Sequence, residues 1–342
     1  MKTKPMTKFA ILTLSLILVA CAGGGSEEAG CPAIDGREIN VVATTPMIGE
    51  FVSQVGGENI NLTVLMPPEA NPHTYEPAPQ DAGTIAEADL VFYTGLLYEP
   101  AALVKLLENS ACSTDILSEV GESVFPIEFK EGGHDDHDDH DDHDDEEGHD
   151  DHDDEEGHDD HEGHNHGAYD PHFWFDPSRV AYAAEYIESR LIQFDPENES
   201  SYISSADSFV SELNDLTKQV SELISTVPSQ NRKLITTHES LGYLEAKFGL
   251  EVLSTIIPSL NSANEISPSD LAGVIDVIED NNVKVIFIES EAPSVYSETI
   301  VAETGIKPVT GLYVETLKPG QSYSEFLISN VKLITENLQD TD

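Results

Sequence analysis

The chain has 342 residues, with 65 Asp and Glu against 16 Lys and Arg, which gives a formal net charge of -49. So acidic a chain lacks the basic surface that binds a phosphate backbone, and this excludes nucleic-acid binding. The same charge favours a site for a cation. The length allows about two domains of ~150 residues each, and the 39% of apolar residues is enough for ordinary buried cores.

The N-terminus has the pattern of an export signal. Three lysines precede an apolar run of 12 residues, Phe9 to Ala20, which is too short to span a bilayer but suits a signal-peptide core. The run ends directly before Cys21 and resembles a bacterial lipobox, which predicts removal of residues 1–20 and lipidation of Cys21. An ordinary signal peptide cut slightly further on is the alternative. Residues 21–37 are then a flexible tether, and lipid rather than a helix holds the mature chain at the membrane.

Two other cysteines, Cys31 and Cys112, remain in the exported chain. An extracytoplasmic compartment permits disulfides, so we expect these two residues to pair. A bridge over so long a loop is worth ~4 kcal/mol in the chain-entropy model. Two free thiols are the alternative.

The first part of the chain alternates between short β-branched runs and longer helical ones. The strand-like runs are Ile39–Ala43, Asn61–Leu65 and Asp89–Tyr93, and the helical ones are Asp81–Ala88 and Glu99–Asn109. This order predicts a parallel sheet flanked by helices. Residues 38–130 are therefore predicted to form an N-terminal α/β lobe, which residues 168–195 complete.

Residues 131–167 interrupt that alternation. The segment 131–166 holds 20 carboxylates, no Lys or Arg, and ten of the 13 histidines, and the unit HDDHDDEEG occurs twice in it. Such a composition cannot bury apolar area and predicts disorder without metal. Imidazoles three residues apart, with carboxylates between them, favour an auxiliary loop that binds divalent cations weakly over a plain acidic linker. Its histidines are His134, His137, His140, His143, His149, His152, His158, His161, His164 and His166.

Two helices are predicted after the acidic segment. The first runs from Pro177 to Phe194, with Asp176 as its N-cap and the proline at its first position. The second occupies residues 196–228, because its apolar positions from Tyr202 to Leu223 are spaced alternately by four and three residues. Counted as far as Thr226, at 1.5 Å per residue, this linking helix would be ~45 Å long, enough to act as a strut between two lobes.

A C-terminal α/β lobe is predicted over residues 229–342. Lys233–Thr237 and Lys284–Ile288 are strand-like, and Ser267–Asn281 between them is helical. The return of the βα order indicates a second parallel sheet flanked by helices.

Outside the acidic segment the chain has only three histidines, each at the end of a predicted element. His73 lies in a proline-dense turn after the second strand, His172 lies beside the only tryptophan, and His238 follows the first strand of the C-terminal lobe. Parallel α/β folds place ligand residues where the chain leaves the sheet. A lone histidine there is more often a surface residue, but these three favour a common metal site, since neutral imidazole is a natural ligand of Zn²⁺.

The segments around these histidines resemble the ZnuA-like family, the solute-binding lipoproteins of ABC importers for zinc and manganese. They read PHTYEP around His73, DPHFWFDP around His172 and THESLGY around His238, with further support from PSLNSANEISP and FIE. The resemblance spans residues 40–337 apart from the acidic segment. It implies two α/β lobes joined by one long rigid helix, with the metal in the interlobe cleft and the three imidazoles as its ligands.

The resemblance leaves the fourth ligand open. The family often uses a carboxylate in the strand-to-loop segment of the second lobe, which implies Glu289, with Glu291 or a water as alternatives. Manganese-binding relatives carry an Asp where this chain has Pro293, and they tend to place a carboxylate where it has His238. Three imidazoles favour Zn²⁺, whereas Mn²⁺, the alternative, prefers more oxygen.

The implied function is capture of Zn²⁺ outside the cell membrane, or in the periplasm, and its delivery to an ABC permease by a lipid-anchored monomer. No reaction is catalysed. Zinc binding should weaken below about pH 6 as the imidazoles protonate.

Three other functions compete with this one. The first is manganese-specific binding within the same family. The second is adhesion or metal scavenging, with the acidic segment as the working part. The third is a zinc-dependent hydrolase, for which Glu239 beside His238 would be the general base, although no HExxH motif accompanies it.

Overall fold

The computed structural model describes residues 31, 34, 36–68, 70–129, 169–257, 267–291 and 295–339. The predicted signal peptide, Cys21 and the ten-histidine segment lie outside these residues, as does Pro293. In the described ranges, no helix combines the length and the apolar character that a membrane crossing needs.

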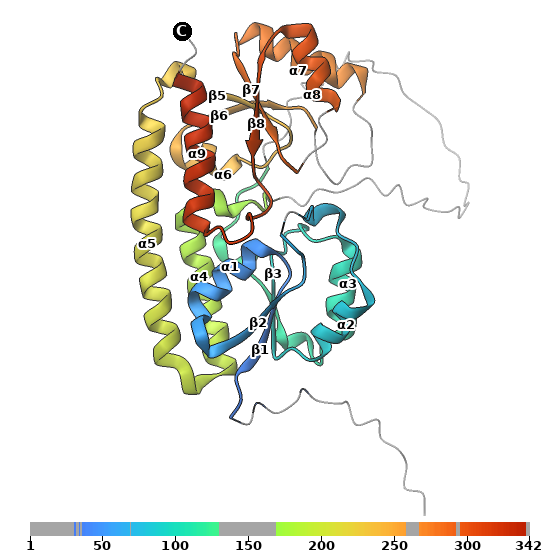
Figure 1. The fold of residues 1–342 in the computed structure, drawn as a ribbon, viewed down its shortest axis with the longest axis vertical. Helices are drawn as coiled ribbons and strands as arrows, with labels where there is room; N and C mark the ends of the chain where they lie inside the picture. The colour runs from blue at the N-terminus through green and yellow to red at the C-terminus, as the bar shows by residue number, and fades with distance from the viewer. Residues whose placement is uncertain are drawn as a thin grey trace, which may run out of the picture. The chain divides into compact units, whose positions relative to one another are not determined.

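The N-terminal lobe is built on a parallel sheet with the strand order β2-β1-β3-β4. Its strands are β1 (Ile39–Ala43), β2 (Ile60–Val64), β3 (Leu90–Tyr93) and β4 (Leu117–Glu119). Its helices are α1 (Pro46–Gly56), α2 (Pro79–Ala86), α3 (Ala101–Ser110) and α4 (Pro177–Phe194). Successive residues of a strand face opposite sides of the sheet. Val41 therefore packs into the apolar core with residues of α1 and α4, and Val42 packs on the other side with residues of α2 and α3 (Figure 1).

The C-terminal lobe contains two parallel strand pairs, β5–β6 and β7–β8, with β5 lying beside β7. Its strands are β5 (Lys233–Thr236), β6 (Glu251–Thr255), β7 (Val285–Glu289) and β8 (Lys307–Leu312). Its helices are α6 (Gly242–Phe248), α7 (Pro268–Asp280), α8 (Val295–Thr304) and α9 (Tyr323–Gln339). Helix α7 begins with a capping box, in which Ser267 and Asp270 each accept from the other's backbone N–H.

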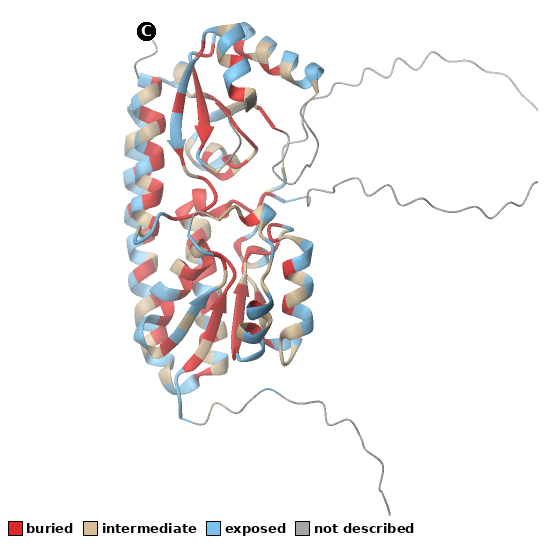
Figure 2. Ribbon diagram, turned by 45° about the vertical axis from the view of Figure 1, so that its right-hand side comes forward, coloured by how far each residue is buried: buried red, intermediate tan, exposed pale blue. Residues whose placement is uncertain are grey.

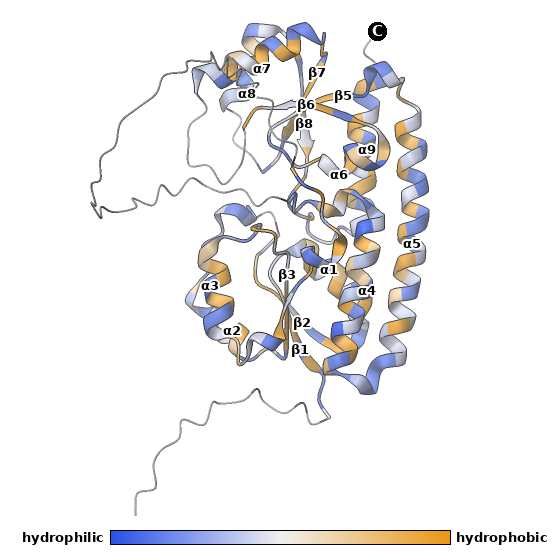
Figure 3. Cartoon of the chain, turned by 180° about the vertical axis from the view of Figure 1, so that it is seen from behind, coloured by the Kyte–Doolittle hydropathy of each residue, from blue (hydrophilic) through white to orange (hydrophobic). Residues whose placement is uncertain are grey.

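The predicted linking helix is confirmed as α5 (Glu199–Ser225), which a 3₁₀ turn at Pro196–Asn198 precedes. Its 27 residues give a length of ~40 Å. The helix packs on α1 and α4 of the N-terminal lobe and on α9 of the C-terminal lobe. Figure 3 shows its apolar stripe; the stripe ends on buried Ile224, whereas the sequence pattern had Leu223 in that place.

More than this helix connects the lobes. Trp174 in the N-terminal lobe donates from its indole nitrogen to the backbone oxygen of Val314 at 2.8 Å, and Tyr323 at the start of α9 donates to the backbone oxygen of Trp174 at 2.6 Å. One continuous apolar core includes residues from β1, α1, α4, α5, α9 and β7, and Figure 2 shows buried positions in the strands of both lobes. The segment between β8 and α9 is thereby held against the N-terminal lobe.

Cys31 and Cys112 form a disulfide, with their Cα atoms 5.0 Å apart. The bridge ties the first described residue of the chain to the end of α3.

Candidate metal centre

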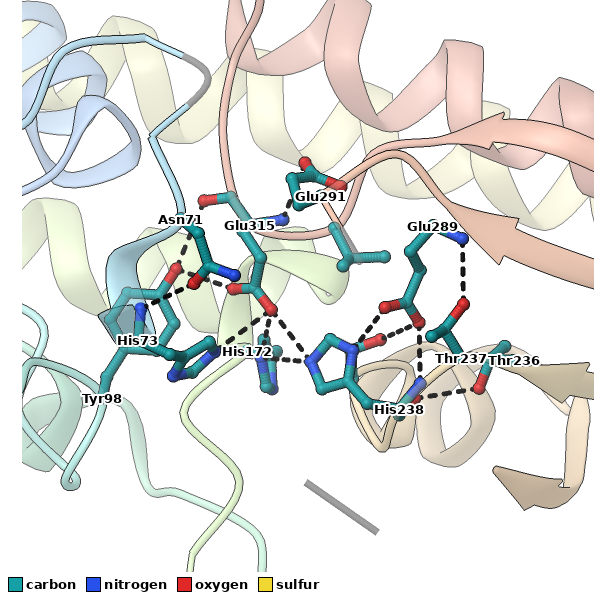
Figure 4. Close-up of polar contacts among 12 residues, drawn as sticks. Asn71, His73, Tyr98, His172, Thr236, Thr237, His238, Glu289, Glu291 and Glu315 are labelled. Carbon is teal, nitrogen blue, oxygen red and sulfur yellow. Dashed lines mark hydrogen bonds and ion pairs between the residues drawn. The ribbon is translucent and has the colours of Figure 1, made fainter. Parts of the chain in front are cut away.

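His73 lies in a 3₁₀ turn, Pro72–Thr74, in the long connection after β2. Pro72 opens the turn, and the side chain of Asn71 accepts from the backbone N–H of His73 at 2.9 Å. This local cap holds the backbone of His73 in place and so sets the direction of its side chain. Figure 4 shows the ring directed toward His172 and Glu315.

His172 is held by a carboxylate two residues before it. One oxygen of Asp170 accepts from the backbone N–H of His172 at 2.9 Å and lies 2.7 Å from Nδ1 of its ring. The next three residues, Phe173–Phe175, form a fully buried 3₁₀ turn that leads into α4, which Asp176 caps. These buried rings and the carboxylate of Asp170 together hold Nε2 of His172 toward Glu315.

His238 follows β5 and is oriented from the neighbouring strand β7. The carboxylate of Glu289, the last residue of β7, accepts from the backbone N–H of His238 at 3.1 Å and forms a very short contact with Nδ1 of its ring. The backbone N–H of Glu289 donates in turn to Thr237 Oγ1 at 3.0 Å. Nε2 of His238, at the other side of the ring, faces Glu315 and His172.

Glu315 completes a group of four. Its Oε1 lies 3.2 Å from Nε2 of His73, 3.4 Å from Nε2 of His172 and 2.9 Å from Nε2 of His238. The last two nitrogens lie 3.5 Å apart, and the four ligand atoms all lie within 4.8 Å of one another. Tetrahedral Zn²⁺ with ligands at ~2.0–2.1 Å has ligand–ligand edges of ~3.3 Å. The four individual distances, from 2.9 to 3.5 Å, lie close to that value.

The structure brings the three predicted histidines together but places neither predicted carboxylate in the fourth position. Glu289 supports the far nitrogen of His238, and Glu291 lies beside the backbone N–H of Glu315 at 3.5 Å. Glu315 occupies the position because β7 and β8 are parallel neighbours, so their carboxyl ends reach the same edge. The signal in the sequence is an acidic residue shortly after a strand of the C-terminal lobe, but the strand itself had not been predicted.

Burial and charge act against each other at this centre. Burial alone would lower the pKa of both His172 and His238. The carboxylates of Glu315 and Asp170 nonetheless raise the pKa of His172 to about 9, and those of Glu289 and Glu315 raise the pKa of His238 to about 10. Burial alone would raise the pKa of Glu315, but the surrounding imidazoles hold it well below its usual range. Without metal, protons therefore take the place of the cation.

Tyr98 is a further contact that the sequence reasoning missed. Its hydroxyl donates to Oε2 of Glu315 at 2.8 Å, and burial, followed by the charge of Glu315, raises its pKa well above the usual value. The phenol is therefore a neutral donor to the carboxylate oxygen that the histidines do not use.

Comparisons with known proteins agree with this architecture. The manganese-binding lipoprotein MntA of Halalkalibacterium halodurans is 23% identical over 95% of this chain and 94% of its own length. The manganese ABC transporter substrate-binding lipoprotein PsaA of Streptococcus anginosus is 26% identical over 98% of this chain and 99% of its own.

Two solved structures share the fold. The periplasmic zinc-binding protein TroA from Treponema pallidum superposes with a TM-score of 0.71 at 21% identity, covering 88% of this chain and 99% of its own. The Fe(III)-bound YtgA from Chlamydia trachomatis gives 0.70 at 24% identity, with 88% and 98% covered. The family model described as the periplasmic component A of a zinc-uptake complex matches residues 41–337. Since that match takes in most of the sequence, the chain belongs to this family of metal-binding, solute-binding proteins.

Proposed function

We propose that this protein captures Zn²⁺ outside the cell membrane and delivers it to the permease of an ABC importer. The observation that carries the proposal is the convergence of three Nε2 atoms and Oε1 of Glu315 within 4.8 Å of one another. Four protein ligands surround the ion completely, which suits a bound cargo. A catalytic zinc keeps one position open for water, so the closed set argues against the hydrolase.

The choice of Zn²⁺ rests on donor chemistry. Imidazole nitrogens suit Zn²⁺, whereas Mn²⁺ prefers carboxylate, carbonyl and water oxygens in a higher coordination number. Manganese is the second candidate, because two of the relatives above are named for that metal.

The setting follows from the same relatives, which are named as lipoproteins and, in one case, as a substrate-binding part of an ABC transporter. We infer that the mature chain is anchored by lipid on Cys21 at the outer face of the membrane. One chain supplies all four ligands, so a monomer is sufficient for binding. The acidic segment would add weak auxiliary sites.

The test is zinc affinity measured by competition with a chelator, with and without residues 134–166. Replacement of His73, His172, His238 or Glu315 by Ala should each weaken the tight site at least ~10-fold, or about 1.4 kcal/mol. His149→Ala in the acidic segment is the matched control and should leave the tight site unchanged. Loss of all tight binding on deletion of the segment, with no effect of the four substitutions, would contradict the proposal. The same competition with Mn²⁺ separates the two metals.

A further inference from the structure

We propose that Tyr98 is a positioning residue that restricts Glu315 to one metal-binding oxygen and thereby makes the centre select Zn²⁺ over Mn²⁺. The inference rests on the proposed function and concerns how the same centre discriminates between its two candidate metals.

The two oxygens of Glu315 have different partners. Oε1 faces the three imidazoles, and Oε2 accepts from the hydroxyl of Tyr98 at 2.8 Å. Both side chains are inaccessible, since Glu315 is 0% and Tyr98 1% exposed, so bulk water does not compete for this hydrogen bond. The two residues come from different lobes, and Figure 4 shows the phenol on the side of the carboxylate away from His238.

The ring of Tyr98 is fixed by edge-to-face contacts with other aromatic rings. Its centroid lies 4.9 Å from that of His73, 5.9 Å from that of His172 and 5.3 Å from that of Trp174. The hydroxyl therefore has a defined position relative to two of the ligands, and it does not follow Glu315 if the carboxylate rotates.

The backbone before Tyr98 is in an unfavourable conformation. Gly95, Leu96 and Leu97 all have positive φ angles, of 76°, 53° and 60°. Residues other than glycine rarely adopt such angles. The buried carboxylate of Glu99 holds this turn by accepting from the N–H groups of Thr94 and Gly95 at 2.6 and 2.9 Å.

This strained turn does not bury both of its leucines, since Leu96 is half-buried and Leu97 exposed. Leu97 is 62% exposed, whereas the next residue, Tyr98, reaches across to the other lobe. Strain of this kind persists at functional positions that the surrounding structure over-determines. The strained conformation is explained by Tyr98, which the turn directs into the interior.

A carboxylate with one oxygen held by a fixed donor presents the other oxygen to a metal. With three imidazoles this gives four ligands, the number that Zn²⁺ takes in a tetrahedron. Mn²⁺ prefers more oxygen ligands, and bringing Oε2 of Glu315 to the metal as well would turn this oxygen away from the fixed hydroxyl of Tyr98. Residues that orient metal ligands typically change metal affinity 10- to 100-fold when they are replaced.

The experiment compares Tyr98→Phe with Tyr323→Phe in the full chain. Both variants keep the aromatic ring, and both remove a hydroxyl that joins the lobes, but Tyr323 donates to the backbone of Trp174 and not to Glu315. Zn²⁺, Mn²⁺ and Co²⁺ are supplied at or below one equivalent. His238→Ala, which keeps the acidic segment, reports binding outside the centre.

For Tyr98→Phe, the ratio of zinc to manganese affinity should fall at least ~10-fold, and the absorption spectrum of bound Co²⁺ should change from four-coordinate to a higher coordination number. Tyr323→Phe should change neither. Equal weakening of both metals with an unchanged Co²⁺ spectrum would overturn the role of Tyr98 and reduce it to a structural contact. A failure of the proposed function looks different, because unaltered protein would then give no tight zinc site that depends on His238.

A measurement on the unaltered chain keeps the proposal testable if Tyr98→Phe does not fold. X-ray absorption at the zinc edge, at one equivalent of metal, should show four ligands at ~2.0–2.1 Å with a single oxygen from a monodentate carboxylate. A bidentate carboxylate would overturn the inference.

Discussion

Zinc binding should release about two protons per ion at pH 7. In the metal-free protein the pKa of His172 is raised to about 9 and that of His238 to about 10, so both rings are protonated at neutral pH. A metal binds only the neutral imidazole. Each proton that must leave changes the apparent affinity tenfold per pH unit, and two change it ~100-fold, or about 2.7 kcal/mol.

The direction in which zinc affinity changes with pH follows from competition between the metal and the protons. Affinity should rise steeply from pH 7 to about pH 9 and become flatter as pH passes the pKa values of His172 and His238. The expectation from the sequence, that binding weakens below about pH 6, assumed imidazoles near their ordinary pKa of about 6.5. The buried carboxylates of Asp170, Glu289 and Glu315 move that loss of affinity to higher pH.

Calorimetry measures the released protons directly, from titrations at pH 7 in two buffers with different heats of protonation. Zinc is kept below one equivalent, and His238→Ala gives the contribution of the acidic segment. Affinity is followed from pH 7 to pH 9 with a competing chelator. Release of fewer than one proton, together with a constant affinity over this range, would refute the reasoning.

Three further predictions concern residues outside the four ligands. Glu289→Gln should weaken zinc binding ~10- to 100-fold in a competition assay, because it replaces the charged partner of His238 Nδ1 by a neutral amide; an unchanged affinity would show that the charge of this contact has no role. The metal-free protein should lose thermal stability as pH rises from about 5 to 10, because the folded-state pKa values of Glu291 (about 7), His172 and His238 all lie above their unfolded values; a melting temperature that rises over this range would contradict those shifts. Cys112→Ser should lower the free energy of unfolding by up to ~4 kcal/mol in denaturant titrations and leave zinc affinity unchanged; a loss of zinc affinity would link the bridge to the site.

Local signals made much of the fold predictable. The β-branched run at Ile39–Ala43 matches β1, and Asp176 caps α4 as expected from its place before a proline. The alternating spacing in residues 196–228 identified the linking helix. Among regular structures, only a helix places apolar residues with this spacing of three and four on one face. The three histidines were identified because the part of the chain outside the acidic segment has no others.

The missed parts depend on tertiary structure. Strand β8 contains Pro308 and Gly311, and only two of its six residues are buried, so neither alternation nor a β-branched run marks it. Without that strand, nothing in the sequence places Glu315 at the edge of the sheet beside Glu289. Tyr98 was missed for a related reason, because its position depends on leucines in a left-handed turn where glycine would be expected.

The central claim is that three imidazoles and Glu315 hold the ion, and a crystal structure grown with one equivalent of Zn²⁺ tests it most directly. Anomalous scattering at the zinc edge should show one strong peak in the cleft, ~2.0–2.1 Å from the Nε2 atoms of His73, His172 and His238 and ~2.0–2.2 Å from Oε1 of Glu315. A zinc ion bound by Glu289 or Glu291, or one with water in place of Glu315, would contradict the account.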